Sequence, residues 1–286
     1  MRIDAHQHFW KYSAAEYEWI SDEMGALKRD FLPHDLRPLL DANGFAGSIA
    51  VQALQSVRET EWLLALAAQN PFILGVVGWV DLCSREVRAD LKRLSSNRKL
   101  VGVRHVVQGE PDDAFMLRAD FRKGIALLAE FDLRYDLLLY PRHLPVAVKL
   151  VEKLPEQTFV LDHIAKPLIA DGVLAPWAQD IAELAKYPNV WCKLSGMVTE
   201  ARWRAWKPAD FRPYLDVVFS AFGTERLMIG SDWPVCTVSA SYAETIVLVT
   251  DYLRGLAEDD FERIRGQNCA RAYGLEAATR NALRCG

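Results

Sequence analysis

Eight apolar, strand-like runs alternate with helical patterns along the chain, and this alternation constrains the fold more than any other feature. The runs are rich in Val, Ile and Leu and mostly lack polar alternation, as expected for strands covered on both faces. They lie at residues 2–6, 48–54, 73–81, 100–107, 134–139, 158–162, 190–194 and 226–230. The helical patterns, with apolar residues at three- and four-residue spacing, lie at 35–43, 59–70, 85–94, 121–131, 144–154, 175–186, 211–222, 242–253 and 261–273.

This order of elements predicts an α/β fold of the (β/α)₈ TIM-barrel type. An open, doubly wound sheet is the alternative, but the Gly-x-Gly-x-x-Gly pattern that often follows the first strand of such a sheet is absent there. No Ser/Gly/Pro-rich linker or low-complexity stretch interrupts the succession. We therefore expect a single domain over residues 1–286.

Composition and charge argue against several classes of function. The formal net charge is −4 and no stripe of Lys or Arg is present, which disfavours a nucleic-acid partner. No apolar run approaches the length of a membrane span, and the first residues lack the apolar stretch of a signal peptide. Five scattered cysteines without Cys-x-x-Cys spacing predict free thiols. We expect a cytoplasmic protein without a membrane partner.

Polar side chains collect where the predicted strands end. The first strand ends in His6-Gln7-His8, and the period of two in a strand puts both imidazoles on one face. Barrel enzymes build their active sites at the carboxyl ends of the strands, so such residues predict an enzyme. The other polar or aromatic residues at these ends are Gln52, Trp79, Arg104, His105, Tyr140, Asp162, His163, Lys193, Ser195, Asp232 and Trp233.

Several of these stretches together carry a family resemblance. They are Ile3-Asp4-Ala5-His6-Gln7-His8-Phe9-Trp10, Val51-Gln52-Ala53, Gly102-Val103-Arg104, Leu161-Asp162-His163-Ile164-Ala165-Lys166-Pro167 and Gly230-Ser231-Asp232-Trp233-Pro234. In this order the chain resembles the amidohydrolase superfamily, and within it the sugar-lactonase group. That group includes L-fuconolactonases, L-rhamnonolactonases and 2-pyrone-4,6-dicarboxylate lactonases. The resemblance implies a distorted barrel of the amidohydrolase type.

The resemblance also implies catalytic roles. Asp232 would be the general base that takes a proton from the attacking water and passes it to the leaving alkoxide. The alternative for Asp232 is a helix N-cap after the eighth strand. The histidines His6, His8 and His163 would polarise the lactone carbonyl, either through a divalent ion or directly as hydrogen-bond donors.

A metal is compatible with the sequence but is not required by it. His6, His8, His163 and Asp232 could hold one zinc ion with an open position for water. The chain lacks the bridging Lys on strand four and the His on strand five of the dinuclear amidohydrolases, which makes a two-metal site improbable. Because the lactonase group includes members that work without metal, we expect zinc to be optional.

Other residues are expected to bind substrate. Arg104 and Lys193 are candidate catalytic or substrate groups, because their charges can hold a carbonyl, a carboxylate or vicinal hydroxyls. The remaining candidates for contacts to sugar hydroxyls and C–H faces are Trp10, His34, Gln52, Trp79, His105, Tyr140 and Trp233. For any single Trp, core packing is the alternative.

The resemblance predicts hydrolysis of a small-molecule sugar lactone to its aldonic acid, with L-fuconolactone or a related 6-deoxy-L-hexonolactone as substrate, and hence a role in L-fucose degradation. The alternatives are a dicarboxylate pyrone lactonase, a non-oxidative decarboxylase of an aromatic or unsaturated acid, and a catalytically silent carbohydrate-binding barrel. We expect a monomer or a small homo-oligomer. The Trp- and Arg-rich segment 199–208 is a lid or an oligomer contact.

Overall fold

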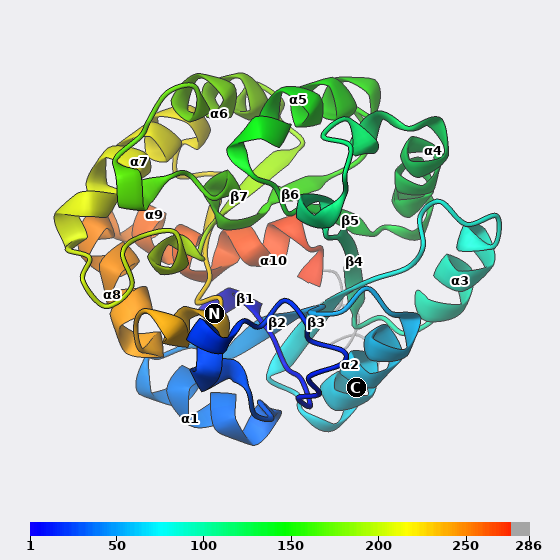
Figure 1. Ribbon diagram of the computed structural model, residues 1–286, viewed down its shortest axis with the longest axis horizontal. Helices are drawn as coiled ribbons and strands as arrows, with labels where there is room; N and C mark the ends of the chain where they lie inside the picture. Colours follow the sequence, from blue (N-terminus) through cyan, green and yellow to red (C-terminus); the bar gives the residue numbers. More distant parts are fainter. Residues whose placement is uncertain (276–286) are drawn as a thin grey trace.

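Eight parallel strands follow one another around the sheet in sequence order, each paired with the next along the chain (Figure 1). They are β1 (Ile3–Gln7), β2 (Gly47–Val51), β3 (Ile73–Gly78), β4 (Leu100–His105), β5 (Arg134–Leu137), β6 (Phe159–Leu161), β7 (Val190–Leu194) and β8 (Leu227–Ile229). This computed structural model describes residues 1–275. Residues 276–286, which include Cys285 and the end of the expected domain, lie outside the described residues.

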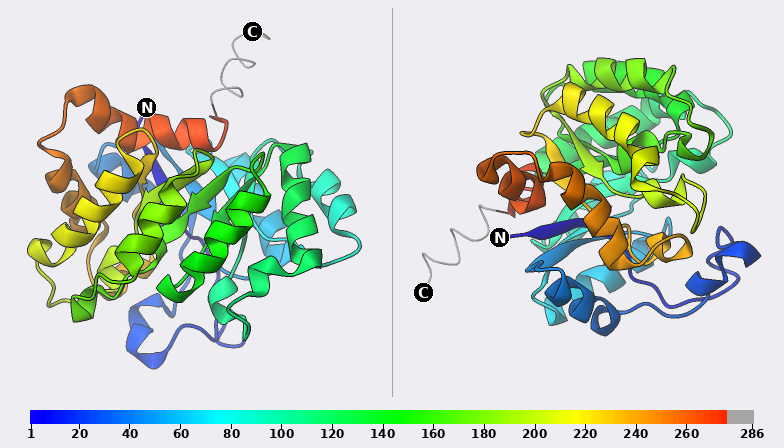
Figure 2. Two further views of the ribbon diagram at one scale, coloured as in Figure 1. Left: turned by 90° about the horizontal axis from the view of Figure 1, so that it is seen from above. Right: turned by 90° about the vertical axis from the view of Figure 1, so that its left-hand side faces the viewer.

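Helices ring the strands on the outside of the barrel (Figures 1 and 2). They are α1 (Pro33–Ala42), α2 (Val57–Gln69), α3 (Val87–Leu94), α4 (Ala119–Leu128), α5 (Leu144–Lys153), α6 (Trp177–Ala185), α7 (Pro208–Phe222) and α8 (Tyr242–Leu253). The buried faces of strands and helices form one large apolar layer between them. The predicted (β/α)₈ barrel is confirmed, and no helix of the described part is long and apolar enough to span a membrane.

The barrel closes between β8 and β1 through the backbone of residues that the sequence marks as functional. The amide of Asp232 donates to the carbonyl of His6 at 2.8 Å, and the amide of His8 donates to the carbonyl of Trp233 at 2.7 Å. Below them, the buried Asp4 carboxylate accepts from the amide and the hydroxyl of Ser231 at 2.9 and 2.6 Å. Closing the barrel therefore also brings the first and last strand ends together.

The helix expected at 261–273 is divided in the structure. It consists of α9 (Glu258–Glu262), a π-helical turn (Arg263–Gln267) and α10 (Asn268–Ala272). Gly266 in the turn packs on the first residues of the chain, where an added Cβ would lie 2.0 Å from the carbonyl oxygen of Met1. Asn268 then donates to the carbonyl of Leu227 at 2.7 Å. The wide turn lets α10 pack across the amino-terminal end of the barrel beside β1 (Figure 2).

Most strands end earlier than the sequence predicts. The runs expected to reach residues 54, 81, 107 and 139 end at Val51, Gly78, His105 and Leu137. The apolar residues beyond these ends are buried or half-buried outside the strands, so hydrophobicity alone extends each predicted strand too far. Cys83, Cys192, Cys236 and Cys269 are free thiols, as expected.

Candidate active site

Three histidines and one aspartate meet at the carboxyl ends of β1, β6 and β8. The Nε2 atoms of His6 and His8 are 3.1 Å apart. Asp232 Oδ1 lies 3.3 Å from His8 Nε2, 3.7 Å from His6 Nε2 and 3.9 Å from His163 Nε2. All four residues are at most 4% exposed. Three histidines from distant parts of the chain thus lie around one carboxylate oxygen.

Unusual backbone conformations present two of these side chains. The four consecutive residues from His163 to Lys166, none of which is glycine, have φ between 48° and 60°. Asp232 has φ 57°. Left-handed backbone is unfavourable for ordinary residues, above all for the β-branched Ile164, and such strain concentrates at functional sites. Gly196, after β7, allows this turn to fit: a Cβ there would lie 2.4 Å from His163 Nδ1.

A buried ionic network lies beneath His6. The Lys193 amine on β7 contacts Asp136 Oδ2 on β5 at 2.6 Å and Asp162 Oδ1 at 2.9 Å, and all three side chains are 0% exposed. Asp162 Oδ2 accepts from Arg104 Nη1 at 3.0 Å, while its Oδ1 lies 3.2 Å from His6 Nδ1. Although burial opposes ionisation of Lys193, the two carboxylates raise its pKa. Paired charges of this kind are costly to break, because removing one partner leaves the other buried and unpaired.

The electrostatics leave His6 and His163 neutral and Asp232 charged. Burial lowers the pKa of His6 well below its ordinary value and lowers that of His163 to about 4. Burial also opposes ionisation of Asp232, but the surrounding histidines outweigh it and hold the pKa of this carboxyl below its ordinary range. At neutral pH the cluster therefore offers one carboxylate acceptor beside the neutral imidazoles of His6 and His163.

The cluster can hold one divalent ion. Ligands bound about 2.0–2.1 Å from a tetrahedral zinc lie roughly 3.3 Å from one another, which matches the spacing of His6 Nε2, His8 Nε2 and Asp232 Oδ1. His8 Nδ1 donates to the carbonyl of Val51 at 2.8 Å, so its Nε2 carries a free lone pair. Asp162 belongs to a second possible ligand group with His6 and His163, but it is already engaged with Arg104 and Lys193.

Arg104 and Lys193 lie below the cluster rather than beside open space. The Arg104 guanidinium donates to Asp162 and to the carbonyl of Gln52, and it is 4% exposed. The contacts of the Lys193 amine are to Asp136, Asp162 and His6, where it lies 3.2 Å from Nδ1. Direct contact of Lys193 with substrate, which the sequence suggested, does not fit its complete burial.

Four of the predicted substrate-binding residues lie near the carboxyl ends of the strands and contact other polar side chains or the backbone there. Trp79 Nε1 donates to His105 Nδ1 at 3.3 Å, and His105 Nε2 lies 2.7 Å from a Glu110 carboxylate oxygen. The half-buried Tyr140 ring has the Lys166 amine 5.9 Å from its centre. The Gln52 side chain donates to the carbonyl of Arg104 at 3.4 Å.

Three other candidates are not brought to the cluster as substrate contacts. The side chain of His34 on α1 is 77% exposed and lies beside Asp35. Trp10 is completely buried and donates its indole N–H to the carbonyl of Arg29 at 2.9 Å. Trp233 is 3% exposed and packs edge-on against Phe31. For Trp10 and Trp233, the packing alternative describes the observed contacts.

The segment 199–208 folds against the beginning of α7. The Trp203 indole donates to the carbonyl of Thr199 at 2.9 Å, and the Trp206 ring packs edge-on against Phe211 with 5.2 Å between centroids. Both tryptophans therefore make packing contacts within the chain.

Sequence reasoning missed three buried acidic or phenolic groups. The sequence pattern places Asp136 only within a predicted strand and Tyr273 only at the end of the last predicted helix, but the Tyr273 hydroxyl donates to Asp136 at 2.7 Å. The pattern makes Glu59 the first residue of a helix, yet its carboxylate accepts from the amides of Ala53 and Leu54 at 3.0 and 2.9 Å. An acidic residue inside an apolar strand, as in Arg134-Tyr135-Asp136-Leu137, is a signal that could have revealed Asp136.

Comparisons with known proteins show the family and the fold of the chain. The amidohydrolase family model matches residues 3–275. The chain is 43% identical to the L-fucono-1,5-lactonase of Burkholderia multivorans over 96% of each chain. It is 39% identical to the L-fucono-1,5-lactonase of Burkholderia ambifaria over 85% of this chain and 83% of that one. A crystal structure of an amidohydrolase from Burkholderia multivorans with bound zinc superposes with a TM-score of 0.92, at 44% identity over 96% of this chain and 99% of that chain.

The buried Glu59 carboxyl makes the stability of the chain depend on pH. Burial raises the pKa of Glu59 from 4.5 to about 7, so the folded state binds this proton more tightly than the unfolded state. The contribution of the protonated Glu59 to the free energy of unfolding is present in full below pH 4.5 and is lost as the pH rises through about 7. Glu59→Gln keeps the acceptor for both amides but does not titrate. Between pH 5 and 8 we expect its free energy of unfolding to decrease by about 2 kcal/mol less than that of the parent.

Denaturant unfolding of both proteins at several pH values measures this difference. Glu61→Gln, at a half-exposed position on the same helix, is the matched control and should follow the parent curve. Parallel curves for the parent and Glu59→Gln would show that Glu59 does not titrate in this range.

Proposed function

The chain belongs to the amidohydrolase family, and from this premise we propose that it hydrolyses a sugar lactone, with L-fucono-1,5-lactone as the first candidate substrate. The observation that carries the proposal is an ionised, buried Asp232 beside three buried histidines, in a chain 43% identical to an L-fucono-1,5-lactonase. Such a cluster supplies a proton acceptor for the attacking water and hydrogen-bond donors for the carbonyl oxygen. This substrate would give the enzyme a role in L-fucose degradation in the cytoplasm.

The reaction follows from the charge states of the cluster. Asp232 accepts a proton from water as the water oxygen adds to the lactone carbonyl carbon. The oxygen of the tetrahedral intermediate becomes negative, and a histidine N–H stabilises it. When the ring C–O bond breaks, Asp232 returns the proton to the departing alkoxide. The products are the open-chain sugar acid and an unchanged Asp232 carboxylate.

His163 is the histidine best arranged to donate. Its Nδ1 lies 2.9 Å from the Ser195 hydroxyl, which can donate to it and so leave the proton on Nε2. Because burial lowers the pKa of His163 to about 4, the ring is neutral at pH 7 and changes little in charge when it donates a hydrogen bond. Nε2 faces the same carboxylate oxygen of Asp232 that accepts the proton of the water.

If a divalent ion binds, His6, His8 and Asp232 would hold it, and it would polarise the carbonyl and acidify water. Zinc is the candidate, since nitrogen and carboxylate ligands at this spacing suit it. Arg104 and Lys193 act in either case as positioning residues, because they hold Asp162, which lies against His6, and also contact His6 themselves.

A decarboxylase is the less favoured alternative, because both relatives described above are lactonases. The substrate is therefore expected to be a neutral lactone rather than an aromatic acid.

Replacing Asp232 with Asn tests the base. Asp232→Asn keeps the shape of the side chain but cannot take up a proton from water, so kcat for L-fucono-1,5-lactone should fall about 10³-fold. Proton release to a pH indicator measures turnover, and thermal unfolding checks the fold. Asp251→Asn, at a half-exposed site on α8, should keep parental activity. An Asp232→Asn enzyme within tenfold of the parent would overturn the assignment.

A second test moves His163 without removing it. Gly196→Ala places a Cβ against the His163 ring, and kcat should fall by tenfold or more, because small displacements of a catalytic group are costly. Gly172→Ala is the matched control: Gly172 has a similar φ of 68° but open space around its Cβ position. Equal activity in the two variants would mean that the position of His163 does not limit the reaction.

Zinc binding is tested on metal-free protein by calorimetric titration with zinc chloride. The parent should bind one equivalent, and His8→Ala should lose it, whereas the exposed His34→Ala should bind as the parent does. We expect the metal-free parent to retain lactone hydrolysis, because Asp232 is already ionised without an ion. Undiminished zinc binding by His8→Ala would refute the ligand set, and complete, zinc-reversible loss of activity would show that the ion is required.

A further inference from the structure

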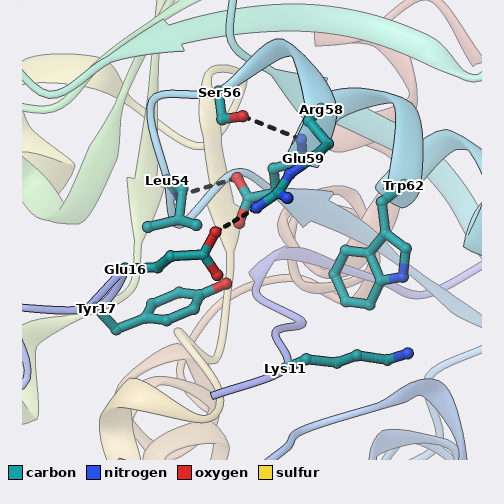
Figure 3. Close-up of a pocket in the computed structure, with 8 residues that line it drawn as sticks. All are labelled: Lys11, Glu16, Tyr17, Leu54, Ser56, Arg58, Glu59 and Trp62. Carbon is teal, nitrogen blue, oxygen red and sulfur yellow. Dashed lines mark hydrogen bonds and ion pairs between the residues drawn. The ribbon is translucent and has the colours of Figure 1, made fainter. Parts of the chain in front are cut away.

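A cavity of about 260 Å³ lies at the carboxyl side of the barrel, between the segment after β1 and the start of α2 (Figure 3). Lys11, Tyr17, Arg58, Glu59 and Trp62 are among its lining residues, and no member of the histidine cluster lines it. The buried Trp10 ring packs between the two sites, with centroids 6.5 Å from His8 and 5.8 Å from Tyr17. The cavity is therefore separate from the active site but close to it.

Glu59 supplies a buried acceptor at this cavity whose hydrogen bonding is incomplete. The residue is 6% exposed, and its Oε2 accepts from the amides of Ala53 and Leu54. The Tyr17 hydroxyl, which also lines the cavity, interacts with the Glu59 carboxyl, and the second oxygen, Oε1, is buried with no hydrogen bond of good geometry in the described part of the chain. A hydroxyl donor from a ligand would complete the hydrogen bonding of this oxygen.

The rest of the lining adds a cation and an aromatic face. Arg58 is paired with Glu16, whereas Lys11 is exposed and has no carboxylate within ion-pair distance among residues 1–275. Figure 3 draws Lys11 and the half-buried Trp62 on one side of the cavity and Tyr17 and Glu16 on the other, with Glu59 between them. Aromatic rings pack against the C–H faces of sugars while polar groups bind the hydroxyls.

We propose that this cavity is a second binding site for an open-chain sugar acid. The carboxylate pairs with Lys11, a hydroxyl donates to Glu59 Oε1, and the carbon chain lies against Trp62. The volume, slightly below the roughly 300–1,000 Å³ of sites for drug-sized ligands, suits a molecule of about six carbons. The inference rests on the proposed function, because hydrolysis of a sugar lactone releases such an acid.

Occupation of this site reaches the active site through the end of β2. The Glu59 carboxylate holds the amides of Ala53 and Leu54, and the preceding residue, Gln52, accepts from Arg104 through its carbonyl. A ligand bound to Glu59 would therefore shift the turn at residues 52–54, whose first carbonyl positions Arg104. Product should slow the reaction partly from this site and not only by competing with substrate.

Calorimetric titration of the full chain with sodium L-fuconate tests the site. The parent should bind two equivalents. Lys11→Met and Trp62→Ala should each weaken one of them about fivefold, while Lys149→Met, which removes an exposed cation elsewhere, should bind as the parent does. The Lys11-dependent binding should persist in Asp232→Asn, and neutral L-fucose should show no dependence on Lys11.

Three results would overturn the second site: L-fuconate binding that Lys11→Met leaves unchanged, a single equivalent that is lost in Asp232→Asn, or no binding by the parent. Lactone hydrolysis measured on the same samples separates this failure from that of the proposed function. An active parent with one Lys11-independent equivalent refutes only the second site, whereas an inactive parent refutes the proposed function.

Discussion

The ion pairs of Lys193 with Asp136 and Asp162 are the interaction on which the site depends. A single charge in the interior of the barrel would be too costly to keep, but one cation between two carboxylates is stable, and each makes the others necessary. The pairs join β5, β6 and β7, and Tyr273 connects them to α10 at the opposite end of the barrel. His6 lies directly on this network, so the position of the catalytic cluster is set by the core of the fold.

Above the network, backbone geometry aims the reacting groups. The left-handed run from His163 to Lys166 and the left-handed Asp232 are conformations that the chain adopts only because the surroundings hold them. The backbone of Asp232 also helps to close the barrel, since its amide donates to the carbonyl of His6. Closure of the barrel between β8 and β1 therefore places Asp232 beside His6.

The sequence predicts the barrel and the meeting of His6, His8, His163 and Asp232, because strand ends in a parallel barrel share one face. It does not predict what a side chain does when that depends on pairing between distant strands. The sequence predicts that Lys193 is a substrate group, but in the structure its amine is paired with Asp136 and Asp162. Trp10 lies in the irregular segment after the first strand, which buries it, and His34 lies on α1 with its side chain in solvent. No periodicity in the sequence encodes the path of this irregular segment.

The central claim is that a lactone carbonyl reacts between Asp232 and His163. A crystal structure of Asp232→Asn with L-fucono-1,5-lactone bound tests this most directly. We expect the carbonyl carbon to lie beside the side chain at position 232, with its oxygen within hydrogen-bond distance of a histidine of the cluster. A lactone bound only away from the cluster, for example in the cavity beside Lys11 and Trp62, would contradict it.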